Sequence, residues 1–112
     1  MTNNREQKRF IKRLNTDFSV DSVTHKGVSS NFSISGLFIR TNYPYTPDTL
    51  LDIAIHLPDG HVSRLKGRVK RSLKTSLGRV MGAPVKSLKN GMGIEIVESD
   101  AHYLHLIRDL ID

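Results

Sequence analysis

Residues 50–73 read LLDIAIHLPDGHVSRLKGRVKRSL and carry the strongest structural signal in the chain. At the start of this stretch Leu51, Ile53 and Ile55 occupy alternate positions, so an extended strand there has one apolar face. The Pro-Asp-Gly sequence at 58–60 follows, and it combines the φ that proline presets with the positive φ that glycine supplies. The stretch therefore predicts an antiparallel hairpin with one face buried.

The return strand of this hairpin, about residues 61–73, alternates in the same way. Its inward positions are Leu65, Gly67, Val69 and Leu73, and its outward positions are Arg64, Lys66, Arg68 and Lys70. The outer face is therefore a row of cations. An ordinary solvated strand face explains this row more simply than a direct ligand role, because charged residues on exposed strands prevent association.

Short apolar stretches separated by turn residues recur along the chain, a pattern typical of a sandwich or barrel. Residues 77–89 are interrupted by glycine and proline, so they predict an irregular strand or a long loop. Alternation then resumes in a closing strand whose inward residues are Met92, Ile94 and Ile96. Gly91 and Gly93 at its start indicate a bulge or a close backbone approach.

After Asp100, a residue type that caps helix N-termini, the apolar period changes to that of an α-helix. The apolar positions are Leu104, Ile107, Leu110 and Ile111. One terminal helix should therefore pack on the barrel. His102 and His105 lie on it three residues apart, but no third ligand is evident, so they are assigned to a solvated face and not to a metal site.

The composition limits the kind of protein and the kind of partner. With 112 residues and no cysteine, the chain suits one core and offers neither a disulfide nor a thiolate zinc site. There is no secretory signal and no apolar run near the roughly 18 residues that cross a bilayer, so we expect a soluble, cytoplasmic protein. A net charge of +6 favours anionic partners: nucleotides, nucleic acid or acidic lipid headgroups.

Residues 28–41 are interpreted as a strand that sorts its side chains onto two faces. Asn31 and Ser33 point outward, about 7 Å apart. Phe32 and Ile34 point the other way. An amide beside a hydroxyl can pair with the edge of guanine, but two polar residues on a wet face are the simpler alternative. Gly36 then permits a turn or bulge before residues 37–39 re-enter the core.

Basic residues crowd the N-terminus, where they form an arm: Arg5, Lys8, Arg9, Lys12 and Arg13. Arg9 and Arg13 share a side of the segment, and each guanidinium fits phosphate oxygens or the O6 and N7 acceptors of guanine. Arg5 and Arg9 have the same spacing, and the later pair is preferred because it lies closer to the first strand. A disordered basic tail is the alternative for such a composition.

Two short motifs in this order resemble those of PilZ domains, a family of receptors for cyclic di-GMP. Residues 9–13, RFIKR, match the RxxxR motif, and residues 31–36, NFSISG, match the (D/N)xSxxG motif. The LPDG turn, the KGRVKR strand and the NGMGIEI segment before a terminal helix are similar to that family's barrel order. The resemblance implies a mostly β fold: a six-stranded antiparallel split barrel with a C-terminal α-helix over residues 15–112, after a flexible arm over residues 1–14.

The same resemblance implies a ligand site and the role of each residue in it. Its residues are Arg9, Arg13, Asn31, Ser33, Gly36 and Lys8, with Arg5, Lys12 and Ser35 as secondary candidates. The two motif arginines would bind phosphate and the guanine Hoogsteen edge, and Asn31 with Ser33 would bind the base edge. Asn31 stands where many members carry Asp, which replaces an acceptor of two guanine N–H groups with a neutral amide. Lys8 is a second cation that would favour a stacked ligand pair.

We expect a non-catalytic receptor without a cofactor, in which cyclic di-GMP orders the arm and changes a surface seen by an unidentified protein. The chain has no Gly-x-Ser-x-Gly elbow and no phosphate-cradling glycine loop, which argues against an enzyme. Two alternatives stay open: a PilZ-fold adaptor that acts through protein contacts without nucleotide, and a general nucleic-acid-binding barrel. For the second, Tyr43 and Tyr45 are the candidates to stack on bases.

Overall fold

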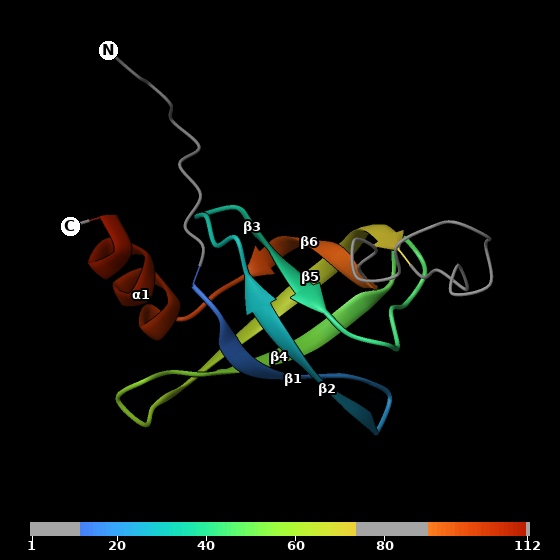
Figure 1. Ribbon diagram of the computed structural model, residues 1–112, viewed down its shortest axis with the longest axis horizontal. Coiled ribbons are helices and arrows are strands. Elements are labelled where there is room, and N and C mark those ends of the chain that lie inside the picture. The colour runs from blue at the N-terminus through green and yellow to red at the C-terminus, as the bar shows by residue number, and fades with distance from the viewer. Residues whose placement is uncertain (1–11, 74–89, 112) are drawn as a thin grey trace, which may run out of the picture.

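The computed structural model describes residues 12–73 and 90–111, and within them six antiparallel strands close into a barrel (Figure 1). The strands are β1 (Leu14–Val20), β2 (Val23–Ser30), β3 (Gly36–Arg40), β4 (Leu50–His56), β5 (Val62–Leu73) and β6 (Gly91–Glu98), followed by α1 (Ala101–Ile111). Their order around the barrel is β1-β2-β3-β6-β5-β4. The predicted six-stranded barrel with a C-terminal helix is confirmed. The irregular segment predicted at 77–89 lies outside the described residues.

The barrel interior is filled by apolar side chains from alternate positions of the strands. They include Leu14, Phe18, Leu37, Ile39, Leu51, Ile53, Ile55, Leu65, Val69, Met92 and Ile94. The hairpin predicted at residues 50–73 is present: β4 pairs with β5, and Gly60 in the turn has a φ of 94°. Its inward residues on β4 are at most 2% exposed, because alternation alone puts them all on the core side.

A β-bulge interrupts β5 between Val69 and Arg71. Val69 pairs with Ile94 of β6, whereas Arg71 pairs with Gly93, so β5 carries one extra residue at this point. Beyond a bulge the inward and outward faces of the strand exchange, and Arg71 therefore faces outward. The prediction that Leu73 faces the core is wrong for the same reason, since this residue is 45% exposed.

Asp100 caps α1, as the sequence predicts. Its carboxylate accepts hydrogen bonds from the backbone N–H of Tyr103 at 3.0 Å, the backbone N–H of Arg64 at 2.8 Å and the hydroxyl of Ser63 at 2.8 Å. The cap therefore also ties the helix to β5. Burial opposes the ionisation of Asp100, but these three donors outweigh it and hold the pKa of the carboxyl below its usual value of 3.8.

The apolar stripe of α1 is displaced from the predicted one. Tyr103, Leu106 and Ile107 are buried, whereas Leu104 is 47% exposed, so the assignment of Leu104 to the core is wrong. A stripe built from leucine and isoleucine alone leaves out Tyr103, whose ring is fully buried while its hydroxyl has a polar partner. This helix, the only one among the described residues, is not long and apolar enough to cross a membrane.

Replacing Asp100 by alanine should lower the free energy of unfolding by about 1–2 kcal/mol near pH 7, because α1 loses its cap and β5 loses an acceptor. Since the folded-state pKa is depressed, this stabilisation is complete above about pH 4 and is lost as the pH falls through the folded pKa. Urea unfolding near pH 7 and near pH 2.5 should therefore show a difference in the free energy of unfolding between wild type and variant that is smaller at the lower pH. Asp109→Ala, which removes an exposed carboxylate from the same helix, should have the same free energy of unfolding as wild type. A difference for Asp100→Ala that does not change with pH would contradict the prediction.

Candidate functional site

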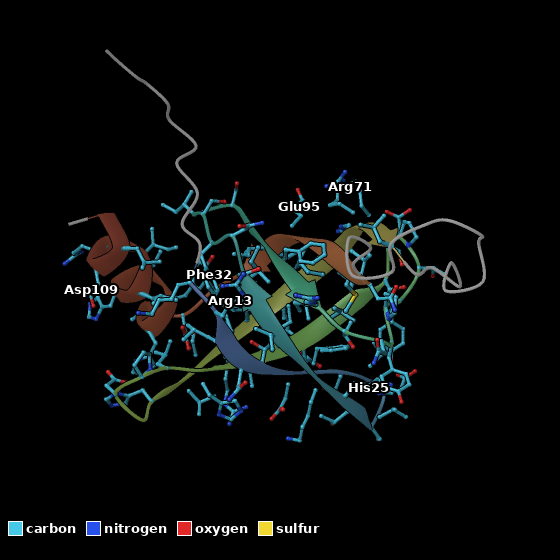
Figure 2. The ribbon with its side chains drawn as sticks, in the orientation of Figure 1. Arg13, His25, Phe32, Arg71, Glu95 and Asp109 are labelled. Atoms are coloured by element: carbon cyan, nitrogen blue, oxygen red, sulfur yellow. The ribbon has the colours of Figure 1, made fainter. Side chains whose placement is uncertain are left out.

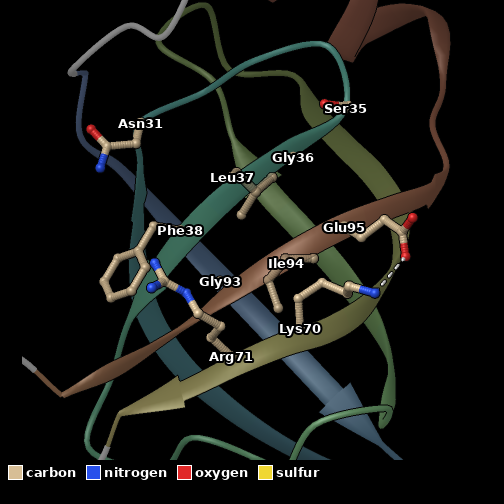
Figure 3. A pocket seen from close by; sticks show the side chains of 10 residues that line it. All are labelled: Asn31, Ser35, Gly36, Leu37, Phe38, Lys70, Arg71, Gly93, Ile94 and Glu95. Carbon is tan, nitrogen blue, oxygen red and sulfur yellow. Dashed lines mark ion pairs between the residues drawn. The ribbon is translucent and has the colours of Figure 1, made fainter. Parts of the chain in front are cut away.

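Two adjoining hollows lie on the outer face of the barrel along β3. The first has a volume of about 340 Å³, and its border includes Arg13, Asn31, Phe38, Arg40 and Arg71. The second has a volume of about 350 Å³, and its border adds Ser35, Gly36, Lys70, Gly93 and Glu95 (Figure 3). Asn31, Phe38 and Arg71 border both hollows, so the two spaces meet along these three side chains.

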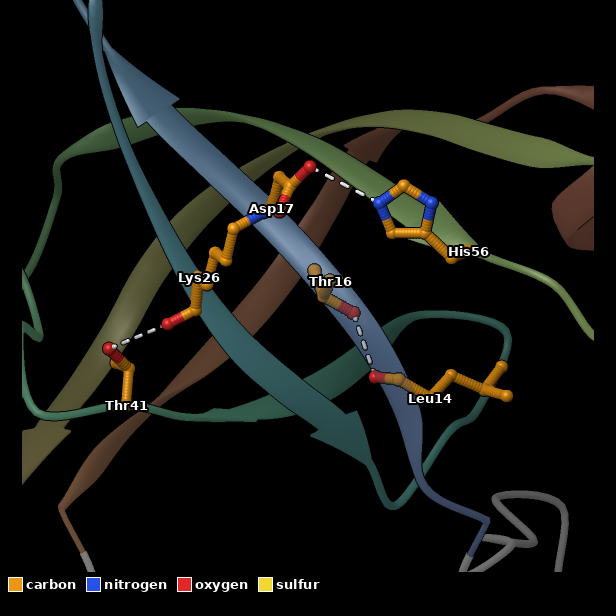
Figure 4. Close-up of polar contacts among 6 residues, drawn as sticks. All are labelled: Leu14, Thr16, Asp17, Lys26, Thr41 and His56. Carbon is orange, nitrogen blue, oxygen red and sulfur yellow. Dashed lines mark hydrogen bonds and ion pairs between the residues drawn. The ribbon is translucent and has the colours of Figure 1, made fainter.

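The first hollow brings together two motifs that are distant in the sequence. Arg13 directly precedes β1, and Asn31 directly follows β2. These strands are antiparallel, with Leu14 opposite Ser29, so the beginning of β1 lies beside the end of β2. The buried hydroxyl of Thr16 lies 2.7 Å from the Ser29 hydroxyl, a contact that holds this end of the strand pair together. The same hydroxyl lies 3.1 Å from the Leu14 carbonyl oxygen within β1 (Figure 4).

The prediction that residues 28–41 form one strand, with Asn31 and Ser33 on one face, is wrong. A loop of residues 31–35 separates β2 from β3. Asn31 is exposed and has a left-handed φ of 54°, a conformation that asparagine adopts more readily than most residues. Ser33 is only 2% exposed, so the two side chains do not share a face. The backbone leaves the strand at Asn31, and side-chain alternation ends there.

Ser33 keeps the loop closed and does not offer its hydroxyl at the surface. The hydroxyl accepts a hydrogen bond from the backbone N–H of Gly36 at 3.1 Å, and the Ser33 N–H donates to the Gly36 carbonyl at 2.9 Å. Tyr103 of α1 donates its hydroxyl to the Ser33 carbonyl at 2.6 Å. Phe32 lies beside the Tyr103 ring, whereas Ile34, predicted to share the face of Phe32, is 64% exposed. The core and α1 therefore anchor the loop.

Gly36 is required by close packing of strands and not by an unusual backbone angle. A Cβ at this position would lie 2.6 Å from the carbonyl oxygen of Ile94 on β6. Among the described glycines only Gly60 has a positive φ. A turn does end at Gly36, as predicted, but glycine is needed there for a steric reason, because the missing side chain lets β3 begin directly against β6.

Arg13, Arg40 and Arg71 give the first hollow a positive charge that no carboxylate on its border balances. No ion pair joins these three guanidinium groups to an acidic side chain within the part of the chain that the structure describes. Arginines without acidic partners can bind oxyanions such as phosphate, because the planar guanidinium presents paired N–H donors. The first hollow is therefore suited to an anionic ligand.

The cationic row of β5 is, by contrast, partly neutralised by two carboxylates, those of Asp52 and Glu95. Lys66 lies 2.9 Å from Asp52, and this hydrogen bond, with the charge of Asp52, raises the pKa of Lys66 above its usual value. Arg68 lies 3.7 Å from Glu95. Lys70 lies 3.9 Å from the same carboxylate (Figure 3). These contacts support the interpretation of the row as a solvated strand face.

Phe38, Arg40 and Arg71 border the hollows and were not among the residues expected there. Phe38 is half-buried on the outer face of β3, so the expectation that it enters the core is wrong. Arg40 lies two residues after Phe38 and shares that face. Alternation counted from the correct start of β3 would have placed both side chains on the outer face. Arg71 points away from the barrel (Figure 2). Simple alternation along β5 would place it inward, but the bulge after Val69 reverses its face.

The other predicted site residues do not all meet at these hollows. Arg5, Lys8 and Arg9 lie outside the described residues. Ser35 borders the second hollow, whereas Lys12 borders a different one, between the β4–β5 turn and α1.

In the described ranges, no group of three or more histidine or acidic side chains is placed to hold a metal ion.

The two tyrosines considered for base stacking differ in exposure. Tyr43 is 59% exposed and stacks on His25, with ring centroids 4.7 Å apart. Tyr45 is partly buried against the core and meets Phe18 edge to face at 6.2 Å. Of the two, Tyr43 alone presents its ring to solvent, and it borders neither of the two hollows.

Comparison with known proteins identifies a family and a fold. A family model described as the PilZ domain matches residues 3–112. No curated protein matches the chain. Among solved structures, that of the Bacillus subtilis inhibitor of motility (MotI/DgrA) is similar, with a TM-score of 0.74 and 19% sequence identity over 98% of this chain and 51% of that one. The chain thus spans about half the length of that protein, and at this identity the likeness shows the fold alone.

Proposed function

Because the chain belongs to the PilZ domain family, we propose that it is a non-catalytic receptor for cyclic di-GMP. One observation carries this proposal: Arg13 of the RxxxR motif and Asn31 of the (D/N)xSxxG motif border the same hollow of about 340 Å³. Cyclic di-GMP has two anionic phosphodiesters and two guanines. Three arginines and an exposed amide around one hollow match both kinds of group, because guanidinium binds phosphate and amides pair with base edges.

In this proposal the arginines of the RxxxR motif bind the phosphates and the Hoogsteen edge of guanine. Arg13 acts from its place beside the end of β2, and Arg9 acts from four residues earlier in the arm. Asn31 pairs with a base edge through its exposed amide. Ser33 is a positioning residue, since its buried hydroxyl holds the loop closed against Gly36 and so keeps Asn31 at the border of both hollows.

We place the receptor in the cytoplasm, where ligand binding would hold the N-terminal arm that precedes Arg13 against the ligand and change a surface that a partner protein recognises. The arm carries much of the positive charge of the chain, so contact with an anionic ligand is the natural cause of this rearrangement. Lys8 adds a cation next to Arg9. This second cation favours the binding of two stacked ligand molecules over the binding of one. The measured stoichiometry distinguishes these two cases.

Isothermal titration of the full chain with cyclic di-GMP, at near-physiological salt, tests the proposal. We expect saturable heat with a micromolar Kd, about −8 kcal/mol, and no saturable heat with GTP. Absence of heat with cyclic di-GMP at tens of micromolar protein would contradict the receptor and favour a PilZ-fold adaptor. Binding to single-stranded oligonucleotides with steep salt dependence, and indifference to the cyclic dinucleotide, would instead favour a nucleic-acid-binding barrel.

Replacing Asn31 by aspartate should tighten cyclic di-GMP binding by about fivefold, because hydrogen bonds to a carboxylate are stronger than those to an amide by about 1 kcal/mol. Asn31→Ala should weaken binding by about tenfold, since it removes the base contact and disfavours the left-handed backbone. Titration of the three proteins measures both effects. Asn15→Asp makes the same charge change on an exposed residue of β1 and should leave the affinity unaltered. Equal affinities of all the variants would remove Asn31 from the site.

A further inference from the structure

Arg71 reaches the hollows from β5, which is separated from β3 by β6. Phe38 of β3 pairs with Gly93 of β6, and Gly93 pairs with Arg71 of β5, so the three residues form one row across the sheet. The bulge that follows Val69 turns Arg71 outward, and this side chain borders both hollows. The site therefore has an arginine that belongs to neither motif.

Gly93 leaves the middle of this row without a side chain. Among the described residues, a Cβ there would meet only the Cβ and Nε atoms of Arg71, each at 4.0 Å, which is ordinary contact. The φ of Gly93 is not in the left-handed region either. Packing and backbone conformation thus do not require glycine here. The Arg71 side chain instead lies over Gly93 and extends across β6 toward the side of Phe38 (Figure 3), a path that a long side chain at position 93 would block.

The charge of Arg71 is not balanced as those of its neighbours are. Arg68 and Lys70 on the same strand lie 3.7 Å and 3.9 Å from Glu95. No ion pair joins Arg71 to a carboxylate anywhere in residues 12–73 and 90–111. A guanidinium that stands between two hollows and lacks an acidic partner is placed to bind an anionic group that lies over both.

We infer that Arg71 binds a phosphodiester of the ligand and that Gly93 is a positioning residue that lets Arg71 cross β6. The inference rests on the proposed function and extends it. Cyclic di-GMP carries two phosphodiesters, so an arginine of the arm and an arginine of the barrel wall can each hold one. Arg13 and Arg71 both border the first hollow, as this division requires.

Titration of Arg71 variants with cyclic di-GMP tests the ligand contact. Arg71→Ala should weaken binding by about tenfold or more, and Arg71→Lys should bind more weakly than wild type but more tightly than Arg71→Ala, because lysine retains the charge but not the paired N–H donors. Arg64→Ala, an exposed arginine of β5 away from both hollows, should bind normally. Normal binding by Arg71→Ala would overturn the phosphodiester role and leave the receptor standing. Failure of the wild type to bind would overturn both.

Variants of Gly93 test the positioning role. Gly93→Ala should bind within about twofold of wild type, whereas Gly93→Leu should be as weak as Arg71→Ala, and the double variant should be no weaker than either single one. Thermal unfolding should show a midpoint for both glycine variants that is no lower than that of wild type. Ala54→Leu, which adds bulk on the outer face of β4, should not affect binding. Normal binding by Gly93→Leu, or a double variant weaker than both single variants, would overturn this role.

Discussion

Replacing Arg9 and Arg13 together by alanine should remove measurable binding of cyclic di-GMP. Each arginine is expected to make charge-assisted hydrogen bonds of about 1.5–3 kcal/mol, so their joint loss weakens a micromolar complex by about a hundredfold or more. Arg13 borders the hollow that also carries Asn31, which supports its part in this effect. Arg9 lies outside the described residues, and the corresponding single variants would separate its contribution. Isothermal titration at near-physiological salt is the measurement.

A matched control distinguishes a binding site from general electrostatic attraction. Arg64→Ala combined with Arg108→Ala removes the same amount of charge from two exposed arginines that border neither hollow. This variant should bind as the wild type does. An equally weak control would mean that net charge, not a defined contact, attracts the ligand. Normal binding by the arm variant would exclude the arm from the site.

Replacing Gly36 by alanine should lower the free energy of unfolding by about 2–4 kcal/mol. The new Cβ would lie 2.6 Å from the carbonyl oxygen of Ile94, and relief requires β3 and β6 to move apart because both groups belong to the paired backbone. The Ser33 turn closes on Gly36, so the same movement should loosen the loop and weaken ligand binding. Urea unfolding measures the first effect, and titration with cyclic di-GMP measures the second.

Gly93→Ala is the matched control, because a Cβ there has its nearest neighbours at 4.0 Å. Its stability should equal that of the wild type or exceed it by up to about 1 kcal/mol, since alanine restricts the unfolded chain more than glycine does. A Gly36→Ala variant as stable as the wild type would contradict the steric explanation. Equal destabilisation by both substitutions would point to strand flexibility in general and not to the approach of β3 to β6.

Local sequence patterns were sufficient for most of the fold. The hairpin at residues 50–73 and the cap at Asp100 could be predicted because alternation, turn chemistry and capping depend on residues close together in the chain. The two motifs also selected Arg13 and Asn31, because residue type and spacing are visible without a structure. The prediction of one strand over residues 28–41 was wrong, because alternation does not reveal where a backbone leaves the sheet.

Contacts between distant segments decided which side chains meet. Arg13 lies near Asn31 because β1 pairs with β2, and Arg71 faces outward because β5 carries an extra residue against β6. Ser33 is buried, and its carbonyl oxygen accepts a hydrogen bond from Tyr103, a residue of the C-terminal helix. Residue type, periodicity and turn chemistry are local properties and can be read from the chain itself. Strand register, the position of a bulge and the partners of a loop are set by packing between segments that are remote in sequence, so they became known only from the folded barrel.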